Sequence, residues 1–364
     1  MSSNIDLHGG NIEEESKRMK VKIDSILDAS ASLVPFECPK SLRRYLKKSI
    51  STHYFKSYPD RSHKDLKKAI SKWHGISPEM VLAGNGASEL ITWAAKEASQ
   101  NGLNSIPAPG FSDYLRALDC WNGNYIHSQI PINWNQQGPQ KFPISPNSEV
   151  LWITNPHNPT GQLWRRGSLE NLLKEYKLVI CDEAFLPLVP NGEKESLVPF
   201  VKNNPNLIVL RSLTKLYSIA GLRIGYAISN PSRLQQWNAI RDPWPINGLA
   251  IAAGIKIFSE IDELRLWTKK VQQWVKKEGD WFYSNLKKIE GIKPFPSSAN
   301  FFLIKGDRSL LDIQSKLKKR LILTRECRSF VGLNDQYLRI SLKKHKDNKR
   351  IISNLRELIK GNFL

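Results

Sequence analysis

Apolar and polar residues alternate along the chain in blocks that predict short buried strands separated by helices. Four apolar residues follow one another within each of 150–154 (VLWIT), 178–181 (LVIC) and 207–210 (LIVL), which is typical of strands covered on both faces. The stretch VLAGNGASELITWAAKEA predicts a strand, a tight glycine turn and a helix over 89–98. The pattern predicts an open α/β sheet, in which ligands bind where the strands end.

From Pro231 onward the pattern becomes helical and includes a long amphipathic helix over about 262–289. The remaining chain alternates strands such as FFLIK and YLRIS with helices in an α+β pattern. The first 35 residues lack strong periodicity. We therefore predict an N-terminal arm over residues 1–35, a large domain over 36–245, and linking helices with a small C-terminal domain over 246–364.

Composition and charge exclude several classes of protein. The net charge of +20 comes from 54 Lys and Arg against 34 Asp and Glu, but the cations are spread over predicted helix faces, so we expect no nucleic-acid partner. The four cysteines are far apart, which argues against a disulfide framework or zinc site and fits a reducing cytoplasm. No apolar run matches a signal peptide or a membrane span, and no spacing such as HExxH indicates a metal. We expect a soluble, cytoplasmic protein with no metal site.

Charged side chains follow the predicted strands at several points. Burial of Lys215 would lower its pKa and allow it to act as a Schiff-base nucleophile. Asp182 ends a buried strand, where an unpaired carboxylate is costly and needs a partner. Arg223 stands between two glycines, and the helix after the glycine turn begins with the amides of Ala87 and Ser88; both features suit an anion. Each feature alone also fits an ordinary strand end or turn.

The segment SLTKLYSIAGLRIGY resembles the active-site signature of the pyridoxal-phosphate aminotransferases of the aspartate aminotransferase fold type. The matching positions are Ser212, Thr214, Lys215, Tyr217, Gly221, Arg223, Gly225 and Tyr226. The resemblance implies fold type I, an α/β fold in which a large domain with a mostly parallel central sheet flanked by helices is joined to a smaller α+β domain. It also implies pyridoxal 5'-phosphate as the cofactor.

The resemblance implies roles for individual residues. Lys215 would carry the cofactor, and Asp182 would keep the ring nitrogen protonated, so that the cofactor acts as an electron sink. The further cofactor contacts implied by the family are Ala87, Ser88, Phe111 stacked on the ring, Asn158 at the 3-hydroxyl, Ser212 and Arg223. Tyr58 matches a tyrosine that reaches the cofactor phosphate of the neighbouring subunit, which implies a homodimer with shared active sites.

Three further motifs resemble the threonine-phosphate decarboxylase branch of this family, which works in corrinoid (cobalamin) biosynthesis. They are HGGN at 8–11, DEAF at 182–185 and the Arg-x-Cys pattern at 325–327. The branch implies a substrate with a carboxylate and a phosphate, bound by His8, Asn11, Arg325 and Arg339. Arg339 also stands between apolar residues of a predicted strand, where a cation without a function would be costly. The sequence does not show which arginine binds which group.

Two observations keep a second reaction open. Histidinol-phosphate aminotransferases are the nearest relatives of this branch, although they typically have a tyrosine where this chain has Phe185 and lack the HGGN arm. The decarboxylase branch usually continues its arm with Ser-Ala-Asn-x-Asn-Pro, whereas this chain reads SASLVP at 30–35. We therefore predict decarboxylation of L-threonine O-3-phosphate to (R)-1-aminopropan-2-yl phosphate, and as the alternative an aminotransferase acting on histidinol phosphate or another amino acid.

Overall fold

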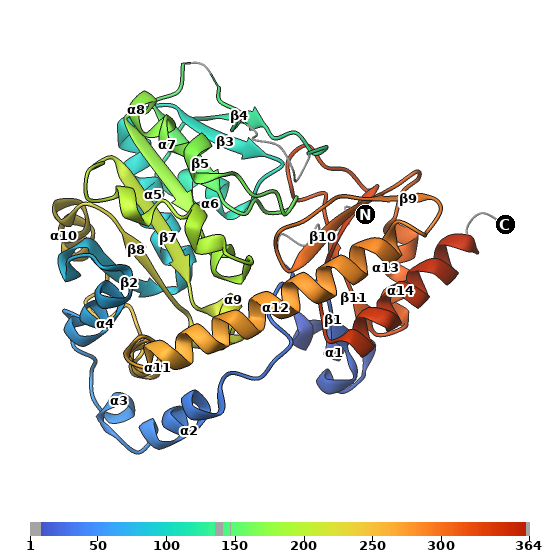
Figure 1. The fold of residues 1–364 in the computed structure, drawn as a ribbon, viewed down its shortest axis with the longest axis horizontal. Coiled ribbons are helices and arrows are strands. Elements are labelled where there is room, and N and C mark those ends of the chain that lie inside the picture. The colour runs from blue at the N-terminus through green and yellow to red at the C-terminus, as the bar shows by residue number, and fades with distance from the viewer. Residues whose placement is uncertain (1–8, 135–140, 146, 362–364) are drawn as a thin grey trace.

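A seven-stranded sheet forms the centre of the larger part of the molecule (Figure 1). The computed structural model describes residues 9–134, 141–145 and 147–361. The strand order is β2-β8-β7-β6-β5-β3-β4. The strands are β2 (Val81–Asn85), β3 (Asn104–Ala108), β4 (Tyr125–Gln129), β5 (Val150–Thr154), β6 (Leu178–Asp182), β7 (Leu207–Ser212) and β8 (Ile224–Ile228). The strands β3 to β7 pair in parallel, and β8 is antiparallel to both β2 and β7, so the predicted mostly parallel sheet is confirmed.

Alternate residues of each central strand build two separate cores, one on each face of the sheet. Ile180 and Leu210 pack with the helices α5, α6 and α10, whereas Cys181 and Val209 pack with α4, α11 and the first part of α12. Both faces are apolar because helices cover both, which explains the uninterrupted apolar runs. These helices are α4 (Lys64–His74), α5 (Gly86–Asn101), α6 (Asp113–Asp119), α10 (Pro231–Ile240), α11 (Gly248–Ser259) and α12 (Ile261–Leu286). The shorter helices of this part are α2 (Lys40–Ser49), α3 (His53–Lys56), α7 (Arg166–Glu170), α8 (Leu172–Glu175) and α9 (Thr214–Tyr217).

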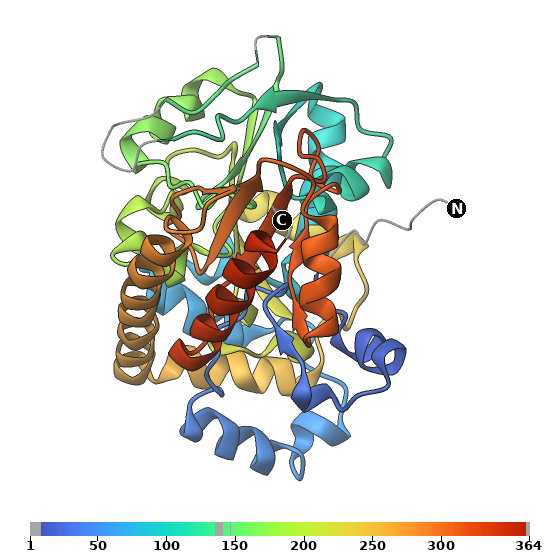
Figure 2. The same ribbon diagram turned by 90° about the vertical axis from the view of Figure 1, so that its right-hand side faces the viewer.

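The smaller part contains an antiparallel sheet with the order β12-β13-β10-β9. Its strands are β9 (Ile292–Pro294), β10 (Phe301–Gly306), β12 (Arg325–Glu326) and β13 (Tyr337–Ser341), and the helices α13 (Leu311–Lys319) and α14 (His345–Lys360) lie side by side against it (Figure 2). The N-terminal segment adds α1 (Ile12–Met19) and β1 (Leu27–Asp28), which pairs in parallel with β11 (Ile322–Leu323). The arm is therefore joined to the smaller part of the molecule through a separate two-stranded sheet.

Helix α12 links the two parts. Val271 and Val275 belong to the core of the large sheet, whereas Phe282 and Leu286 belong to the core of the small one. The helix ends three residues before the predicted boundary at 289. Helix α11, which begins just after residue 246, packs on the large sheet. The domain boundary at residue 246 stays a prediction, because the change from one core to the other does not occur there.

Two predicted elements differ in length from those observed. Strand β7 continues to Ser212, two residues beyond the apolar run, and helix α5 begins at Gly86 rather than at residue 89. Hydrogen bonding along the sheet extends the strand, and the glycine at φ 75° lets the chain turn directly from β2 into the helix. Ala87 and Ser88 consequently lie in the first turn of α5, where backbone N–H groups have no partner within the helix.

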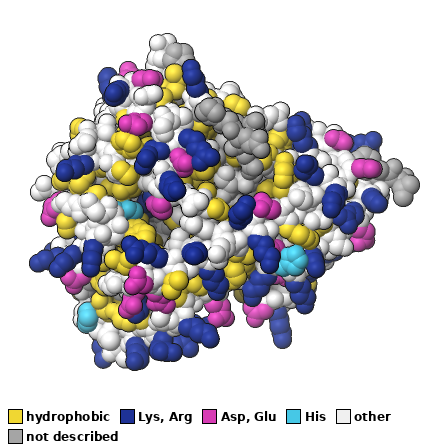
Figure 3. Space-filling view, in the orientation of Figure 1, with side chains coloured by type: hydrophobic (Ala, Val, Ile, Leu, Met, Phe, Trp, Pro, Cys, Tyr) yellow, Lys and Arg dark blue, Asp and Glu magenta, His cyan; other side chains and the backbone are white. Residues whose placement is uncertain are grey.

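The cations are dispersed on the face of the molecule that Figure 3 shows, where Lys and Arg side chains alternate with acidic and apolar ones. This distribution fits a solvated surface rather than a continuous anion-binding stripe. Within the described ranges, none of the helices combines the length and the apolar character required to cross a bilayer.

Candidate functional site

A cavity of about 220 Å³ lies at the carboxyl ends of the parallel strands, between the large sheet and the small one. The arm contributes Gly9 and residues 30–32 to its wall, and β13 contributes Arg339. The residues predicted from the sequence that line this cavity are Ala87, Ser88, Phe111, Asn158, Asp182, Ser212, Lys215, Arg223 and Arg339.

Lys215 stands in the short helix α9, which directly follows β7. Burial lowers the pKa of Lys215 to about 8, and the positive charges of Arg339 and Arg223 act in the same direction, whereas Asp182 opposes them. Its Nζ atom lies 5.4 Å from the centre of the Phe185 ring. A substantial fraction of this amine is neutral near pH 8, and only the neutral form can attack a carbonyl group.

Asp182 is buried at the end of β6 and is held by two donors. The backbone N–H of Ala184 donates to Oδ1 at 2.9 Å, and the hydroxyl of Tyr114 donates to Oδ2 at 2.8 Å. Tyr114 is in turn 2.8 Å from the hydroxyl of Thr154. Burial raises the pKa of Asp182, while the two donors and Lys215 counteract that rise. The carboxylate is therefore preorganised to accept a hydrogen bond from a cationic N–H group in the cavity.

An anion cradle lies at the other end of the cavity, at the N-terminus of α5. Arg223 has a φ of 55°, an uncommon conformation for a residue with a side chain, and its guanidinium lies against Gly86. A Cβ atom on Gly86 would lie 2.4 Å from Nη2 of Arg223, and one on Gly225 would lie 2.8 Å from the backbone nitrogen of Ala87. The two glycines thus allow β8, Arg223 and the free amides of α5 to approach one point, which suits a phosphate.

Arg339 connects the small sheet to the wall of the cavity. Its Nη1 donates to Oδ1 of Asn158, in the turn after β5, and its Nη2 donates to the backbone oxygen of Ser30 at 3.1 Å. Its Nε is buried and has no partner among the described residues. Burial lowers the pKa of Arg339 to about 10, and the nearby Arg325 contributes to this shift. An anion that enters the cavity would supply the missing acceptor.

Three of the predicted site residues that the structure describes do not line this cavity. Asn11 and Arg325 line an adjoining cavity that shares Gly9 and Ser30 with the first. Tyr58 lies elsewhere: it is 80% exposed, and its ring is 4.5 Å from that of Trp244. His8 lies outside the described residues.

Sequence reasoning missed several residues that line the cavity, chiefly Tyr114, Thr154 and Ser32. Tyr114 stands in α6, three residues after the predicted Phe111, and Thr154 ends a predicted strand, so both lie near positions that the sequence indicated. Their contact with Asp182 spans three separate elements, and no local pattern indicates it. The side chain of Ser32 bonds to that of Ser341 at 2.8 Å, a contact between residues 309 positions apart.

The comparisons with known proteins agree with this geometry. The family model described as "Aminotransferase class I and II" matches residues 25–355. The threonine-phosphate decarboxylase of Salmonella typhimurium is 31% identical over 97% of both chains, and a histidinol-phosphate aminotransferase of Caldanaerobacter subterraneus is 28% identical over 96% of both. The solved structure of the histidinol-phosphate aminotransferase from Clostridium acetobutylicum superposes with a TM-score of 0.81, at 26% identity, over 92% of this chain and all of that one.

Proposed function

The chain belongs to the aminotransferase class I and II family, whose enzymes use pyridoxal 5'-phosphate, and from this premise we propose that it decarboxylates L-threonine O-3-phosphate. The products would be carbon dioxide and (R)-1-aminopropan-2-yl phosphate, a step in cobalamin biosynthesis. The alternative within the same family is an aminotransferase that acts on histidinol phosphate or another amino acid.

The residues of the cavity fit the cofactor. The N-terminus of α5 and Arg223 suit its phosphate, Asp182 suits its ring N–H, and Lys215 is placed to bind its carbonyl carbon. Phe111 and Ala184 lie in the same wall and offer apolar surface to the ring. When bound, pyridoxal phosphate withdraws electrons from the α-carbon of an amino acid and so weakens the bonds to that carbon.

The proposal that the substrate has two anionic groups is based on two neighbouring arginines, Arg325 and Arg339. Arg325 on β12 stands directly opposite Arg339 on β13. Their guanidinium groups lie 5.4 Å and 5.8 Å from the same ring, that of Phe330, and each arginine lines a different one of the two adjoining cavities. Two like charges this close repel each other, and a ligand that carries both a carboxylate and a phosphate would relieve that repulsion. Histidinol phosphate has a phosphate but no carboxylate.

The experiment is to incubate the purified, cofactor-loaded protein with L-threonine phosphate and to measure carbon dioxide and aminopropanol phosphate. Release of both in equal amounts is expected. L-threonine is the matched control, because it lacks only the phosphate and should react at least about tenfold more slowly, the effect of losing one charged hydrogen-bonding partner. Formation of an oxo acid from an added amino donor, with no carbon dioxide, would instead establish the aminotransferase.

The lowered pKa of Lys215 predicts that the apoprotein captures its cofactor faster as the pH rises. The pKa is about 8, and the neutral amine is the reactive form. Its neutral fraction rises about tenfold between pH 7 and pH 9 for such a pKa, so the capture rate should rise by a similar factor and then level off. The rate is followed as visible absorbance after mixing. A rate that continued to climb beyond pH 10 would show that the amine has its ordinary pKa.

Replacing Tyr114 with phenylalanine should shift the pH range in which the apoprotein binds pyridoxal phosphate. The hydroxyl of Tyr114 lowers the pKa of Asp182, so its removal should raise that pKa. A hydrogen bond to a charged group contributes about 1.5–3 kcal/mol, which corresponds to roughly one to two pH units. The acid limb of cofactor affinity, measured by titration at each pH, should move up by that amount. Thr154→Val is the control: it removes only the second contact of the same hydroxyl and should cause a smaller shift.

We also propose a homodimer with shared active sites. Tyr58 is far more exposed than a large aromatic side chain usually is, and its ring lies tilted against that of Trp244, over which Arg61 also lies at 4.4 Å. Among the described residues, Tyr58 is absent from the wall of its own chain's cavity. A second copy of the chain would cover this aromatic surface and receive Tyr58 at its own cofactor phosphate.

Mixing two inactive subunits tests this arrangement. A dimer of one Tyr58→Phe subunit and one Lys215→Ala subunit would contain one intact site and one doubly defective site. Random reassociation makes about half of the dimers hybrid, so about a quarter of the wild-type activity is expected above that of the unmixed variants. The same two proteins combined immediately before the assay, without exchange of subunits, provide the control. No gain after exchange would argue that each site is complete within one chain.

A further inference from the structure

The ends of β6 and β7 are joined on the face of the sheet that points away from the cavity. Side chains alternate along a strand, so Asp182 and Ser212 face the cavity while their neighbours Glu183 and Arg211 face the opposite core. The two strands are parallel neighbours, and the backbone N–H of Glu183 donates to the oxygen of Leu210 at 2.9 Å. Glu183 and Arg211 are therefore each one peptide unit from a residue of the functional site.

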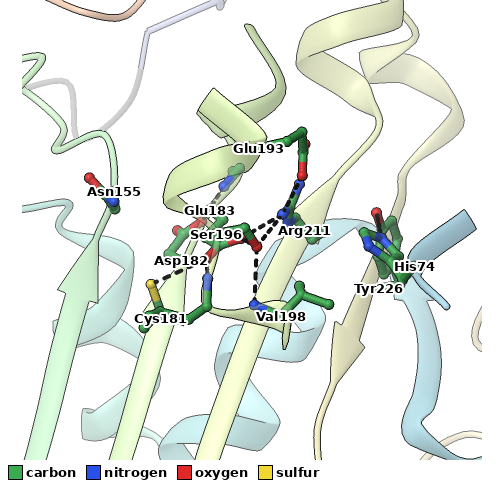
Figure 4. Close-up of polar contacts among 12 residues, drawn as sticks. His74, Asn155, Cys181, Asp182, Glu183, Glu193, Ser196, Val198, Arg211 and Tyr226 are labelled. Carbon is green, nitrogen blue, oxygen red and sulfur yellow. Dashed lines mark hydrogen bonds and ion pairs between the residues drawn. The ribbon is translucent and has the colours of Figure 1, made fainter. Parts of the chain in front are cut away.

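Glu183 and Arg211 form a buried ion pair, shown in Figure 4. Nη2 of Arg211 lies 2.7 Å from Oε2 of Glu183, and the two side chains are 2% and 0% exposed. Glu183 also accepts hydrogen bonds from the hydroxyl of Ser196 at 2.8 Å and from the backbone of Leu197 at 2.7 Å. With a further, weaker contact from the thiol of Cys181 at 3.9 Å, the carboxylate of Glu183 has four donors around it, which fixes its position.

Arg211 is held equally firmly. Its guanidinium contacts both carboxylate oxygens of Glu193, at 2.8 Å and 3.0 Å, and the hydroxyl of Ser196. Burial by itself would lower the pKa of Arg211, but Glu193 and Glu183 outweigh it and hold that pKa above its usual value. On its other side, His74 bonds to the hydroxyl of Tyr226 at 2.9 Å and stays neutral, because burial and Arg211 lower its pKa to about 3. No second cation therefore competes for the two carboxylates from that side among the described residues.

Stability alone does not account for this pair. A buried ion pair often contributes no more to folding than apolar side chains of similar size, because removing both charges from water is costly. What the pair supplies is a fixed distance between two strand ends. We propose that Glu183 and Arg211 are positioning residues that set the spacing between Asp182 on β6 and the Ser212–Lys215 segment after β7.

The action is mechanical rather than electrostatic. Burial is the largest cause of the shifted pKa of Asp182; the others are the donors Ala184 and Tyr114 and the charges of Lys215 and Asp113, and neither Glu183 nor Arg211 is among them. This positioning role rests on the proposed use of pyridoxal phosphate, but it holds whether the protein catalyses decarboxylation or transamination. Cofactor-binding measurements can therefore disprove the positioning role without bearing on the proposed reaction, and the reverse is also true.

The test uses cofactor-binding measurements as well as activity. The variants are Glu183→Gln, Arg211→Met and the double variant Glu183→Leu/Arg211→Met, which replaces the pair by apolar side chains. For each, the dissociation constant of pyridoxal phosphate from the apoprotein, the pH midpoint of the visible band of the bound cofactor, and the thermal unfolding temperature are measured. We expect at least tenfold weaker cofactor binding and a displaced midpoint in all three, with the unfolding temperature of the double variant close to that of the wild type.

Glu193→Gln is the matched control. It removes the charge of the other, partly exposed carboxylate that Arg211 contacts and leaves the bond between Glu183 and Arg211 in place. The cofactor affinity of this variant should stay within about twofold of the wild-type value, and its pH midpoint should equal that of the wild type. An equal loss in this control would overturn the proposal, because the effect would then belong to Arg211 in general and not to the link between the strands.

If a single variant fails to fold, the double variant provides the test of the positioning role. Wild-type affinity and midpoint in a folded double variant would overturn the proposal. If the double variant is also unfolded, Arg211→Lys retains the charge with a less extensive contact to Glu183, and it should still displace the midpoint, by less than we expect for the other variants. An unchanged midpoint in Arg211→Lys would likewise overturn it.

Discussion

Lys215→Ala is expected to reduce turnover by at least about 10⁴-fold, the upper end of what one proton-transferring side chain contributes. Lys215 is the one amine that lines the cavity within the described residues, and it lies beside Asp182 with a pKa lowered to about 8. In the proposed arrangement, the substitution removes the nucleophile that would hold the cofactor and the amine that would transfer a proton at the reacting carbon. Product release by the cofactor-saturated variant is the measurement.

The control for this prediction separates loss of chemistry from loss of folding. Arg223 and the N-terminus of α5 remain in the variant, so pyridoxal phosphate should still bind without a covalent bond and should be removable by dialysis. The thermal unfolding temperature should not fall, because the variant relieves the burial of an amine. Activity above about one per cent of the wild-type value would show that another group performs the proton transfer.

Asp182→Asn should reduce turnover by about 10²–10³-fold, the usual effect of removing one preorganised electrostatic partner. An amide does not favour the protonated ring nitrogen as a carboxylate does, so the bound cofactor would withdraw electrons less effectively. The substitution preserves the local structure: its Oδ1 can still accept the N–H of Ala184, and its amide can donate to the hydroxyl of Tyr114.

Two measurements check the prediction for Asp182. The catalytic constant should fall while the Michaelis constant changes little, since Asp182 would contact the cofactor and not the substrate in the proposed arrangement. Asp182→Glu serves as the comparison, because it keeps the charge but moves the carboxylate by one methylene group in a buried position. A similar loss in both variants would mean that position matters more than charge. An unaffected catalytic constant in Asp182→Asn would contradict the assigned role.

The large sheet and the cofactor end of the site were predictable because they depend on local order along the chain. Apolar runs predicted strands β5, β6 and β7, and parallel strands necessarily bring their carboxyl ends to one edge of a sheet. Asp182 and Lys215 each follow such a run, so their proximity follows from their place in the sequence. The same reasoning applies to Ala87 and Ser88, which start a helix directly after a strand.

The substrate end was less predictable. Arg325 and Arg339 were both singled out, yet nothing in the sequence showed that they stand opposite each other and line two different cavities. Asn11 was expected beside the substrate, and it lines the adjoining cavity with Arg325. These relations depend on how β12 pairs with β13 and on how β1 pairs with β11, and strand pairing over long separations is not encoded in local periodicity.

By itself, the sequence determined the class of fold, because a hydrophobic pattern and a turn act over a few residues. Through its resemblance to a known family it also indicated the cofactor, and it named most of the predicted side chains that line the cavity. The tertiary structure alone decided which polar groups support those side chains. Tyr114 reaches Asp182 across 68 positions of sequence, and Arg339 reaches Ser30 across 309. Each contact forms only when separate helices and strands pack together, since burial makes an unpaired polar group costly and so selects the arrangement in which each finds its partner.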